Sequence, residues 1–287
     1  MSEQPYEVIR YRAEERVAWI TLARPEAMNA LSMAMRAEIV RALRAAESDE
    51  GVAVAVIEGD GPSFCAGYDL KEPYGSAGDR QARAGWVHDQ NLAGWTDQFS
   101  RSCLADWLTL WDLLKPVVAV VHGNCLAGGM ELAAMADIVF AADDARFGYP
   151  PLRAMSTPDV PFFPWKLSMA RAKYLQLTGN SISGAEASDW GLVAKCFPAD
   201  SLRERAAAEI RAMASIDPAL LAANKHQVNQ AYETMGMRTH LAQNWSWHQL
   251  SGQVRPRKGE FFEIAAASGL KAALEWMNGP FKREGLQ

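Results

Sequence analysis

The chain has 287 residues, of which 49% are hydrophobic and 22% are charged, and its formal net charge is −5. This composition is ordinary for a globular protein, and the length allows one large core with an appended region. The acidic charge gives no long-range attraction to nucleic acid or to an anionic membrane, so we expect neither as a partner. The four cysteines lack CxxC spacing and the first residues lack the order of a secretory signal, which predicts a reducing, cytoplasmic location.

The first part of the chain predicts strands and a helix. Apolar and polar residues alternate at residues 6–11 and 16–22, which predicts two antiparallel strands. Residues 33–46 carry apolar side chains at helical spacing. Residues 52–57 form an almost uninterrupted apolar run, which is typical of a strand that is covered on both faces.

The middle of the chain repeats an order of strand, turn and helix. Residues 72–79 are rich in glycine, proline and charge and predict an exposed loop, and residues 81–114 return to helical spacing. A second buried strand is expected at residues 116–121, a helix at 128–135 and a third strand at 137–140.

The last part of the chain predicts helices. Ser183 and Glu186 have the spacing of a capping box at a helix start. From residue 202 to residue 276 the pattern is helical with no candidate strand, so we expect a boundary near Asp200. The most apolar stretch, residues 117–142, is interrupted by charged side chains and therefore predicts no transmembrane helix.

Motif spacing argues against several common sites. The sequence has no GxSxG nucleophile elbow, no GxxxxGKS/T phosphate loop and no GxGxxG at a helix start. Serine hydrolase, P-loop and Rossmann sites are therefore not expected. The five histidines do not pair at HxxxH spacing and do not approach a cysteine pair, so we expect no metal site.

Two segments rich in small residues each follow a predicted buried strand. The first reads FCAGYDLKE from Phe64 to Glu72, and the second reads GNCLAGGMEL from Gly123 to Leu132. Together such turns can point two backbone N–H groups at one carbonyl oxygen, which is how a protein holds an enolate. The alternative is that the glycines only relieve tight turns.

These segments resemble the crotonase family, which is also called the enoyl-CoA hydratase/isomerase family. FCAGYDLKE is similar to the first oxyanion loop of that family, and HGNCLAGGMELAAMADI is similar to its second, helix-initiating loop. The stretch RPEAMNAL at residues 24–31 and the stretch at residues 177–193 support the likeness, which spans roughly residues 6–200. Four motifs in the same order make this resemblance specific.

The resemblance implies an α/β fold with two regions. Residues 1–200 would form a crotonase-like spiral of ββα units that holds a CoA thioester site. Residues 201–287 would form a helical C-terminal region for trimerisation and for completing the pocket. The resemblance also implies a homo-trimer or a dimer of trimers, an acyl-CoA thioester substrate that brings coenzyme A with it, and no separately bound cofactor.

The resemblance also implies roles for individual residues. The backbone N–H groups of Tyr68 and Gly128 would form the oxyanion hole, and Glu131 would be a catalytic general acid or base. A carboxyl group buried one turn into an apolar helix has a raised pKa, which suits that role. Further residues are expected to contact the substrate or its CoA: Ala27, Ala66, Asp69, Leu70 and Lys71.

The sequence departs from the family at the second catalytic glutamate. Counting from Glu131 without a gap places Pro151 there, and proline cannot transfer a proton. Asp159 lies eight residues further on, where dienoyl-CoA isomerases and chlorobenzoyl-CoA dehalogenases carry a catalytic aspartate. We therefore name Asp159 as a catalytic candidate, although its neighbours also suit an ordinary turn.

The resulting hypothesis is an enzyme that stabilises a thioester enolate, as an enoyl-CoA hydratase or isomerase. The alternative is a non-catalytic acyl-CoA-binding or RNA-associating protein of the same fold. Cys65 and Cys125 flank the proposed site and are expected to be small apolar fillers. Four tryptophans at helical spacing are expected to pack a core or a subunit contact, with an acyl pocket as the alternative: Trp86, Trp95, Trp107 and Trp111.

Overall fold

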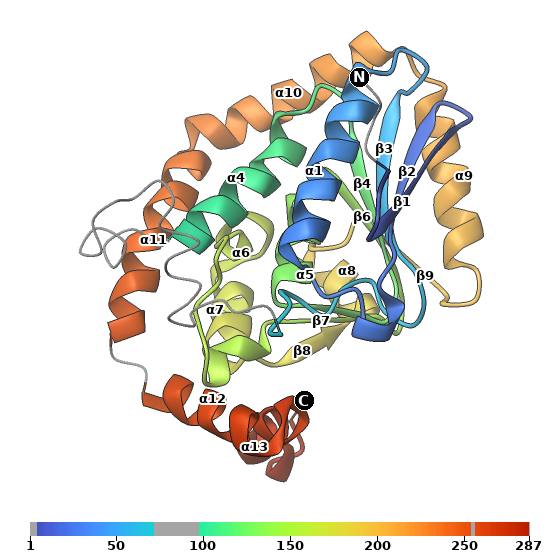
Figure 1. The fold of residues 1–287 in the computed structure, drawn as a ribbon. Coiled ribbons are helices and arrows are strands. Elements are labelled where there is room, and N and C mark those ends of the chain that lie inside the picture. The colour runs from blue at the N-terminus through green and yellow to red at the C-terminus, as the bar shows by residue number, and fades with distance from the viewer. Residues whose placement is uncertain (1–4, 72–97, 254–255, 287) are drawn as a thin grey trace.

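The structure is a computed structural model that describes residues 5–71, 98–253 and 256–286. The described residues form two sheets, of six and three strands (Figure 1). The larger sheet contains, in spatial order, β1 (Ile9–Glu14), β2 (Val17–Leu22), β3 (Val54–Gly59), β4 (Val117–Val121), β6 (Ile138–Ala142) and β9 (Lys195–Phe197). The smaller sheet contains β5 (Asn124–Leu126), β7 (Arg146–Gly148) and β8 (Ser181–Ser183).

The large sheet is the centre of the core. Every residue of β2 and β4 is buried, because these parallel strands are covered by helices on both faces. From β2 to β9 neighbouring strands are parallel, and β1 joins the edge as the antiparallel partner of β2. The parallel strands are linked by crossover helices, which include α1 (Met33–Ser48), α4 (Gln98–Asp112) and α5 (Gly128–Met135).

The two sheets are connected in a repeating ββα order. The chain leaves β4 in the large sheet, adds β5 to the small sheet, enters α5 and returns to the large sheet at β6. The segment after β3 lies beside the small sheet, because Cys65 forms a parallel bridge with Cys125 of β5. The segment after η1 (Pro25–Ala27) lies next to it in turn, because Leu31 forms a parallel bridge with Tyr68. The stacked turns form a spiral, and the predicted α/β fold of ββα units is confirmed.

The other helices surround this spiral. Helix α9 (Leu202–Ala214) packs on the large sheet, on the face opposite to α1 (Figure 1). The predicted capping box is present, since the Ser183 hydroxyl accepts from the Glu186 N–H and the Glu186 carboxylate accepts from the Ser183 N–H. The remaining elements are η3 (Pro150–Arg153), α6 (Phe163–Lys166), α7 (Met169–Thr178), α8 (Gly184–Trp190), α10 (Pro218–Thr234) and α11 (Met237–Gln253).

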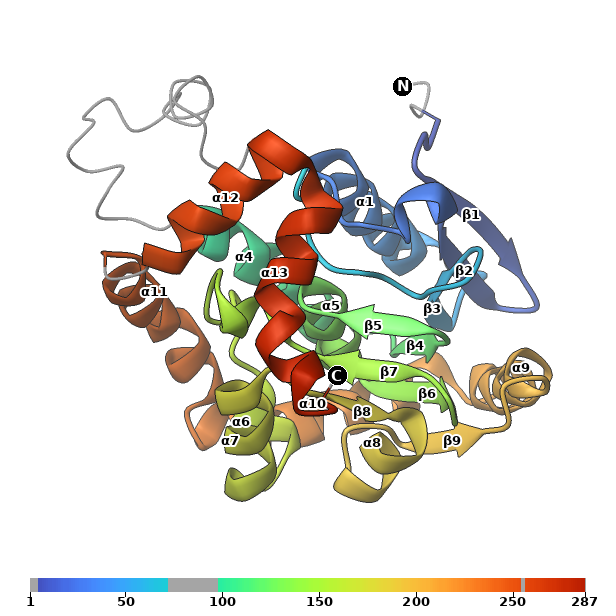
Figure 2. The ribbon, with the colours of Figure 1, turned by 90° about the horizontal axis from the view of Figure 1, so that it is seen from below.

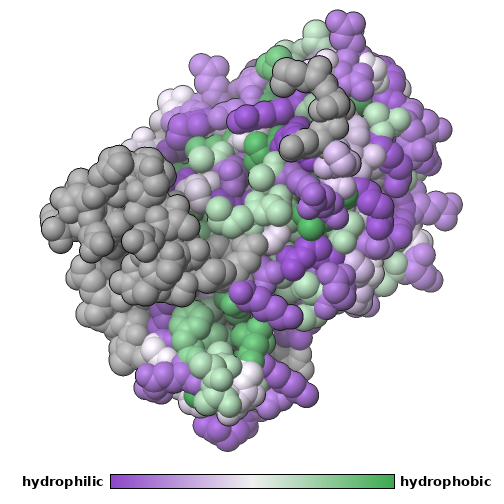
Figure 3. Space-filling view, viewed as in Figure 1, coloured by the Kyte–Doolittle hydropathy of each residue, from purple (hydrophilic) through white to green (hydrophobic). Residues whose placement is uncertain are grey.

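Two further helices, α12 (Pro256–Ser268) and α13 (Leu270–Arg283), lie beneath the core in Figure 1 and face the viewer in Figure 2. Their own small apolar cluster includes Phe261 and Met277, and Leu70 packs against it. Apolar side chains also reach the surface at this end of the molecule, where Figure 3 shows green patches and where Phe262 is exposed. The helical C-terminal region is therefore confirmed for the described residues.

The predicted elements of the first half of the chain are present within a few residues of their expected ends. The predicted loop at residues 72–79 lies outside the described residues, as do Trp86 and Trp95. Of the helical stretch predicted at residues 81–114, the described part is α4. Four strands of three residues each were not predicted: β5, β7, β8 and β9. None of the described helices is long and apolar enough to cross a membrane.

Arg153 joins the C-terminal helices to the spiral. Its guanidinium donates to Asn278 Oδ1 of α13 at 2.7 Å and to Asn180 Oδ1 of the core at 2.9 Å. The same group lies 3.9 Å from the ring centroid of Phe281. Arg153 is itself buried, so these bonds are shielded from water.

Replacing this arginine should loosen α12 and α13 without unfolding the sheets. We expect Arg153→Ala to lower the local opening free energy of α13 by about 2 kcal/mol, because charged hydrogen bonds are lost. Hydrogen exchange measured by mass spectrometry should then be faster in residues 256–283 and unchanged in β2–β4. The exposed Arg283→Ala on the same helix is the control. Equal exchange in both variants would show that Arg153 does not hold the helix.

Candidate active site

Backbone hydrogen bonds place the two predicted loops side by side. The Cys65 N–H donates to the Asn124 carbonyl at 2.9 Å, and the Leu126 N–H donates to the Cys65 carbonyl at 2.9 Å. Gly67 has φ of 109°, and a Cβ built on it would lie 2.8 Å from the Ala127 Cβ. A side chain at position 67 would therefore push the two loops apart.

The N–H groups of Tyr68 and Gly128 belong to the two adjoining loops and are available. The bridge between Leu31 and Tyr68 uses the Gly67 carbonyl and the Asp69 N–H, so the Tyr68 N–H points away from Leu31. Gly128 is the first residue of α5, where an N–H has no acceptor within the helix. Among the described residues neither N–H has a hydrogen-bond acceptor. The arrangement can therefore bind one oxygen with two donors.

The chain enters α5 through a strained residue. Ala127 has φ of 50° and ψ of −123°, which side chains other than glycine rarely adopt. Its own N–H donates to the Gly148 carbonyl of β7 at 2.9 Å, and its carbonyl accepts from the N–H groups of Met130 and Glu131. The surrounding hydrogen bonds therefore hold Ala127 in this conformation.

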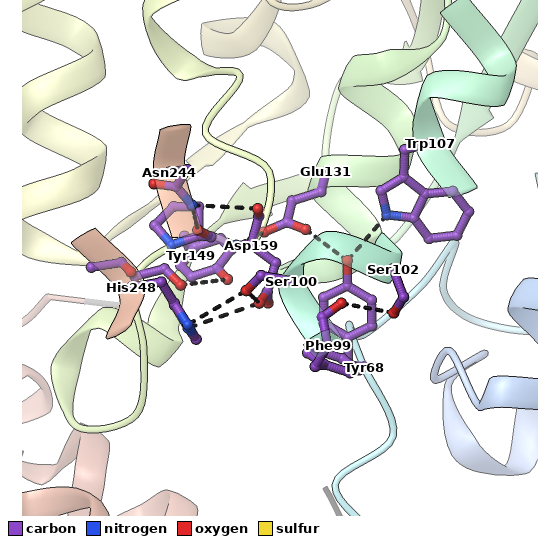
Figure 4. A network of polar contacts seen from close by, with 12 residues as sticks. Tyr68, Phe99, Ser100, Ser102, Trp107, Glu131, Tyr149, Asp159, Asn244 and His248 are labelled. Atoms are coloured by element: carbon purple, nitrogen blue, oxygen red, sulfur yellow. Dashed lines mark hydrogen bonds and ion pairs between the residues drawn. The ribbon is translucent and has the colours of Figure 1, made fainter. Parts of the chain in front are cut away.

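Glu131 lies one turn into α5 and is fully buried. One carboxyl oxygen accepts from the Asp159 N–H at 2.9 Å, and the other accepts from the Tyr68 hydroxyl at 2.7 Å (Figure 4). Burial and then the nearby charge of Asp159 raise the pKa of Glu131 to about 8, although the hydrogen bonds from Tyr68 and the backbone act in the opposite direction. A carboxyl group with this pKa can take or give a proton near neutral pH.

Asp159 is buried in the loop before α6, and its carboxylate points away from Glu131 (Figure 4). The Ser100 hydroxyl donates to Asp159 Oδ1, and His248 Nε2 lies 3.8 Å from the same oxygen. Asn244 of α11 donates to the Pro158 carbonyl at 2.7 Å and so fixes the loop. The structure thus brings both catalytic candidates, Glu131 and Asp159, into one network.

The side chain of Tyr68 is a site feature that sequence reasoning missed. Its hydroxyl donates to Glu131 and accepts from Trp107 Nε1 at 3.1 Å. Burial and then neighbouring acidic groups raise the pKa of Tyr68 well above its usual range, so the phenol stays protonated. Sequence spacing locates the Tyr68 N–H but carries no signal for the direction of its ring.

Residues from distant helices were missed for the same reason. Ser100 comes from α4, and His248 and Asn244 come from α11, and no motif connects them with Asp159 in the sequence. Trp107 is fully buried, as expected for a tryptophan that packs a core. Its indole N–H also donates a hydrogen bond to the Tyr68 hydroxyl.

The predicted CoA contacts lie along the first loop. The Ala66 N–H donates to the Met28 carbonyl, which brings Ala66 beside Ala27 in η1. Leu70 packs against the cluster between α12 and α13, and Lys71 is exposed.

Asp69 stabilises this loop through an ion pair and a hydrogen bond. Its carboxylate binds Arg24 at 2.8 Å and accepts from the Lys71 N–H at 3.0 Å. The Arg24 guanidinium also donates to the Ala30 carbonyl at 2.8 Å. Asp69 therefore ties the first loop to the segment that follows η1.

Pro151 lies in η3, where its carbonyl accepts from the Met155 N–H. It is not part of the polar network around Glu131. Tyr149, two residues earlier, is fully buried, and burial followed by the charges of Glu131 and Asp159 raises its pKa well above the usual range. The network thus contains a second protonated phenol close to Glu131.

Other candidate chemistry is not supported. Burial raises the pKa of Cys65 to about 12 and that of Cys125 well above its usual range, so both remain thiols, as predicted for apolar fillers. Among the described residues no group of three or more His, Cys, Asp and Glu side chains could hold a metal ion. A cavity of about 400 Å³ lies between α4, α6 and α10; Trp111 lines it, but none of the predicted catalytic, oxyanion-hole or CoA-contact residues does.

The raised pKa of Glu131 should appear in the pH dependence of stability. Below the usual glutamate pKa of 4.5 the carboxyl is neutral in both states, and as the pH rises towards 8 ionisation favours the unfolded chain. The free energy of unfolding of the wild type should therefore fall between about pH 5 and about pH 8, compared with that of Glu131→Gln over the same range. Urea unfolding at both pH values measures this difference. The exposed Glu204→Gln on α9 should show no such change, and a flat difference for Glu131→Gln would contradict the raised pKa.

Comparison with known proteins shows the family to which the chain belongs. The sequence model of the enoyl-CoA hydratase/isomerase family matches residues 12–271. A probable enoyl-CoA hydratase of Mycobacterium bovis is 32% identical over 232 residues, which cover 80% of this chain and 84% of that protein. A crystal structure of an enoyl-CoA hydratase/isomerase from Xanthobacter autotrophicus Py2 is 34% identical, with a TM-score of 0.86 and coverage of 96% and 99% of the two chains. An enoyl-CoA hydratase from Mycobacterium smegmatis is 29% identical, with a TM-score of 0.84 and coverage of 96% and 94%. The chain is thus a member of the enoyl-CoA hydratase/isomerase family.

Proposed function

We propose that this protein is an acyl-CoA enzyme that stabilises a thioester enolate and acts as an enoyl-CoA hydratase or isomerase. The observation that carries the proposal is the position of two available N–H groups, from Tyr68 and Gly128, beside the buried Glu131. Two donors and one proton carrier are the groups that enolate chemistry requires.

In the proposed mechanism the thioester oxygen binds between the Tyr68 and Gly128 N–H groups. When negative charge develops on this oxygen, both donors and the N-terminal dipole of α5 stabilise it. One such donor typically contributes about 3 kcal/mol to the transition state. The α-proton of the thioester becomes more acidic as a result.

Glu131 then moves a proton at the α-carbon. Its pKa of about 8 lets it act as a base or an acid without a large penalty near neutral pH. The second carboxyl group of the proposed site belongs to Asp159, whose N–H orients Glu131 and whose charge raises the Glu131 pKa. This pair suits proton transfer between carbons at least as well as hydration.

The substrate brings the only cofactor in this mechanism, as its coenzyme A portion. The backbone around Ala27 and Ala66 together with Leu70 and Lys71 would contact it, and the Lys71 ammonium suits a CoA phosphate. Asp69 would act indirectly, by holding this loop through Arg24. Four free cysteines suit our proposal that the protein works in the reducing cytoplasm.

Glu131→Gln separates catalysis from binding. Incubation of wild type with a panel of short, branched and aromatic enoyl-CoA thioesters in heavy water should add a whole heavy water or exchange deuterium into the acyl chain, as read by mass spectrometry. Glu131→Gln should lose more than about 100-fold of this activity and keep its affinity for acyl-CoA. The exposed Glu204→Gln serves as the control.

Each other result has a defined meaning. Binding without any turnover by wild type would favour the non-catalytic acyl-CoA-binding alternative, to which Pro151 lends support. Deuterium without added oxygen would favour isomerisation over hydration. Loss of this exchange in Asp159→Asn, with hydration retained, would assign Asp159 to proton transfer between carbons.

We also propose that the protein assembles as a homo-trimer or a dimer of trimers. Large apolar side chains are exposed on several helices of the single chain, and they include Leu177 of α7, Leu220 of α10 and Trp247 of α11. Exposed apolar side chains of this kind often mark subunit contacts. Light scattering coupled to gel filtration should give three or six times the 31.5 kDa mass of one chain. The mass of a single chain would contradict the proposal.

A further inference from the structure

Tyr68 brings two different groups to one place. Its N–H belongs to the proposed oxyanion hole, and its hydroxyl lies 2.7 Å from Glu131 Oε2. The hydroxyl also accepts a hydrogen bond from Trp107 Nε1 at 3.1 Å (Figure 4). A hydroxyl that donates to one carboxyl group and accepts from an indole N–H is held in a defined direction.

The ring of Tyr68 is fixed by its neighbours. A Cβ built on Gly128 would lie between 2.6 and 2.7 Å from three of its atoms, so glycine at position 128 makes room for the ring. Phe99 of α4 meets the ring edge to face, with 5.0 Å between centroids. The phenol is therefore placed by packing as well as by hydrogen bonds.

These contacts suit a phenol that passes a proton. The Trp107 N–H points at the phenol oxygen, so it can stabilise the negative charge that develops there when the proton leaves. Glu131 can accept the proton that leaves this oxygen, because the Tyr68 hydroxyl already donates a hydrogen bond to its carboxyl group. The Arg36 guanidinium lies 5.8 Å from the ring centroid, but it is paired with Asp106 and adds little net charge.

The carboxylate of Asp159 is less suited to this task. Its Oδ1 accepts a hydrogen bond from the Ser100 hydroxyl and lies 3.8 Å from His248 Nε2. Its hydrogen bond to Glu131 is made by its backbone N–H and not by its carboxylate. Pro151, which the sequence places at the position of the second glutamate, has no side-chain proton that could be transferred. Tyr68 is thus a side chain whose own O–H donates to Glu131 directly, at 2.7 Å.

We propose that the Tyr68 hydroxyl is the second proton-transferring group of the site and forms a relay with Glu131. This inference rests on the proposed function. In hydration, water attacks the β-carbon and its O–H bond breaks, so that its proton passes to the Tyr68 oxygen. The Tyr68 proton passes to Glu131 as the proton on Glu131 forms the new bond to the α-carbon. The electron pair of the carbon–carbon double bond makes that bond. Tyr68 and Glu131 are both protonated again at the end of the step, as they were at its start.

Tyr68→Phe tests the relay, because it keeps the backbone N–H and the ring and removes only the hydroxyl. We expect hydration of the best enoyl-CoA of the panel to fall about 100-fold in kcat with little change in KM. Exchange of the α-protons of butyryl-CoA in heavy water needs only the oxyanion hole and Glu131, so it should fall less than about threefold. The pH profile of this exchange should move to higher pH, because the Tyr68 hydrogen bond lowers the pKa of Glu131.

Two further variants separate proton transfer from packing. Trp107→Phe removes the donor to the phenol oxygen and should lower hydration about tenfold with exchange nearly unchanged. Phe99→Leu changes packing on the same ring without a polar atom, so it should change both reactions by the same factor. Circular dichroism checks the folding of each variant, and Trp107→Phe tests the relay if Tyr68→Phe does not fold.

The outcomes are distinguishable. Equal loss of both reactions in Tyr68→Phe would make Tyr68 a packing residue and overturn the relay, and so would unchanged hydration. Exchange without hydration by wild type would overturn the relay and leave the enolate chemistry in place. Neither reaction in wild type would overturn the proposed function together with the relay.

Discussion

The close backbone contact between the loops at residues 65–68 and 125–128 is the constraint on which the site depends. Hydrogen bonds join main-chain atoms of Cys65 to Asn124 and Leu126, so the loops approach to the spacing of neighbouring strands. No side chain fits between them, and Gly67 and Gly129 meet this requirement. Because the contact is made by the backbone, it places the amides of residues 68 and 128 independently of the side chains that surround them.

The buried carboxyl of Glu131 carries an electrostatic cost. A charge removed from water is expensive unless donors surround it, and Glu131 receives one hydrogen bond on each oxygen. Even so, burial and the charge of Asp159 outweigh these bonds and raise the pKa of Glu131 to about 8, so that the carboxyl is mostly protonated at neutral pH. The same helix that buries Glu131 provides the N–H of Gly128, so the proposed proton carrier and the proposed oxygen-binding donor cannot move independently.

The sequence predicts the framework better than the surroundings of the site. Helix α5 and Glu131 were predictable because the glycine turn, the buried strand and the apolar helix follow one another within 20 residues. The strands β5, β7 and β8 have three residues each, which is too short for an alternating pattern, and they exist because a neighbouring turn of the spiral pairs with them. The contacts of Tyr68 with Trp107 and of Asp159 with Ser100 join residues 39 and 59 positions apart, and they depend on where the folded chain places α4.

The strained backbone of Ala127 has a cost in free energy that is met when the chain folds. A non-glycine residue at positive φ costs of order 1–3 kcal/mol, and the hydrogen bonds of β5, β7 and α5 around it offset that cost once, as the chain folds. The Gly128 N–H consequently has its direction before any ligand arrives. Such preorganisation means that little reorganisation energy remains for the reaction itself, and the protein carries the cost as a lower overall stability.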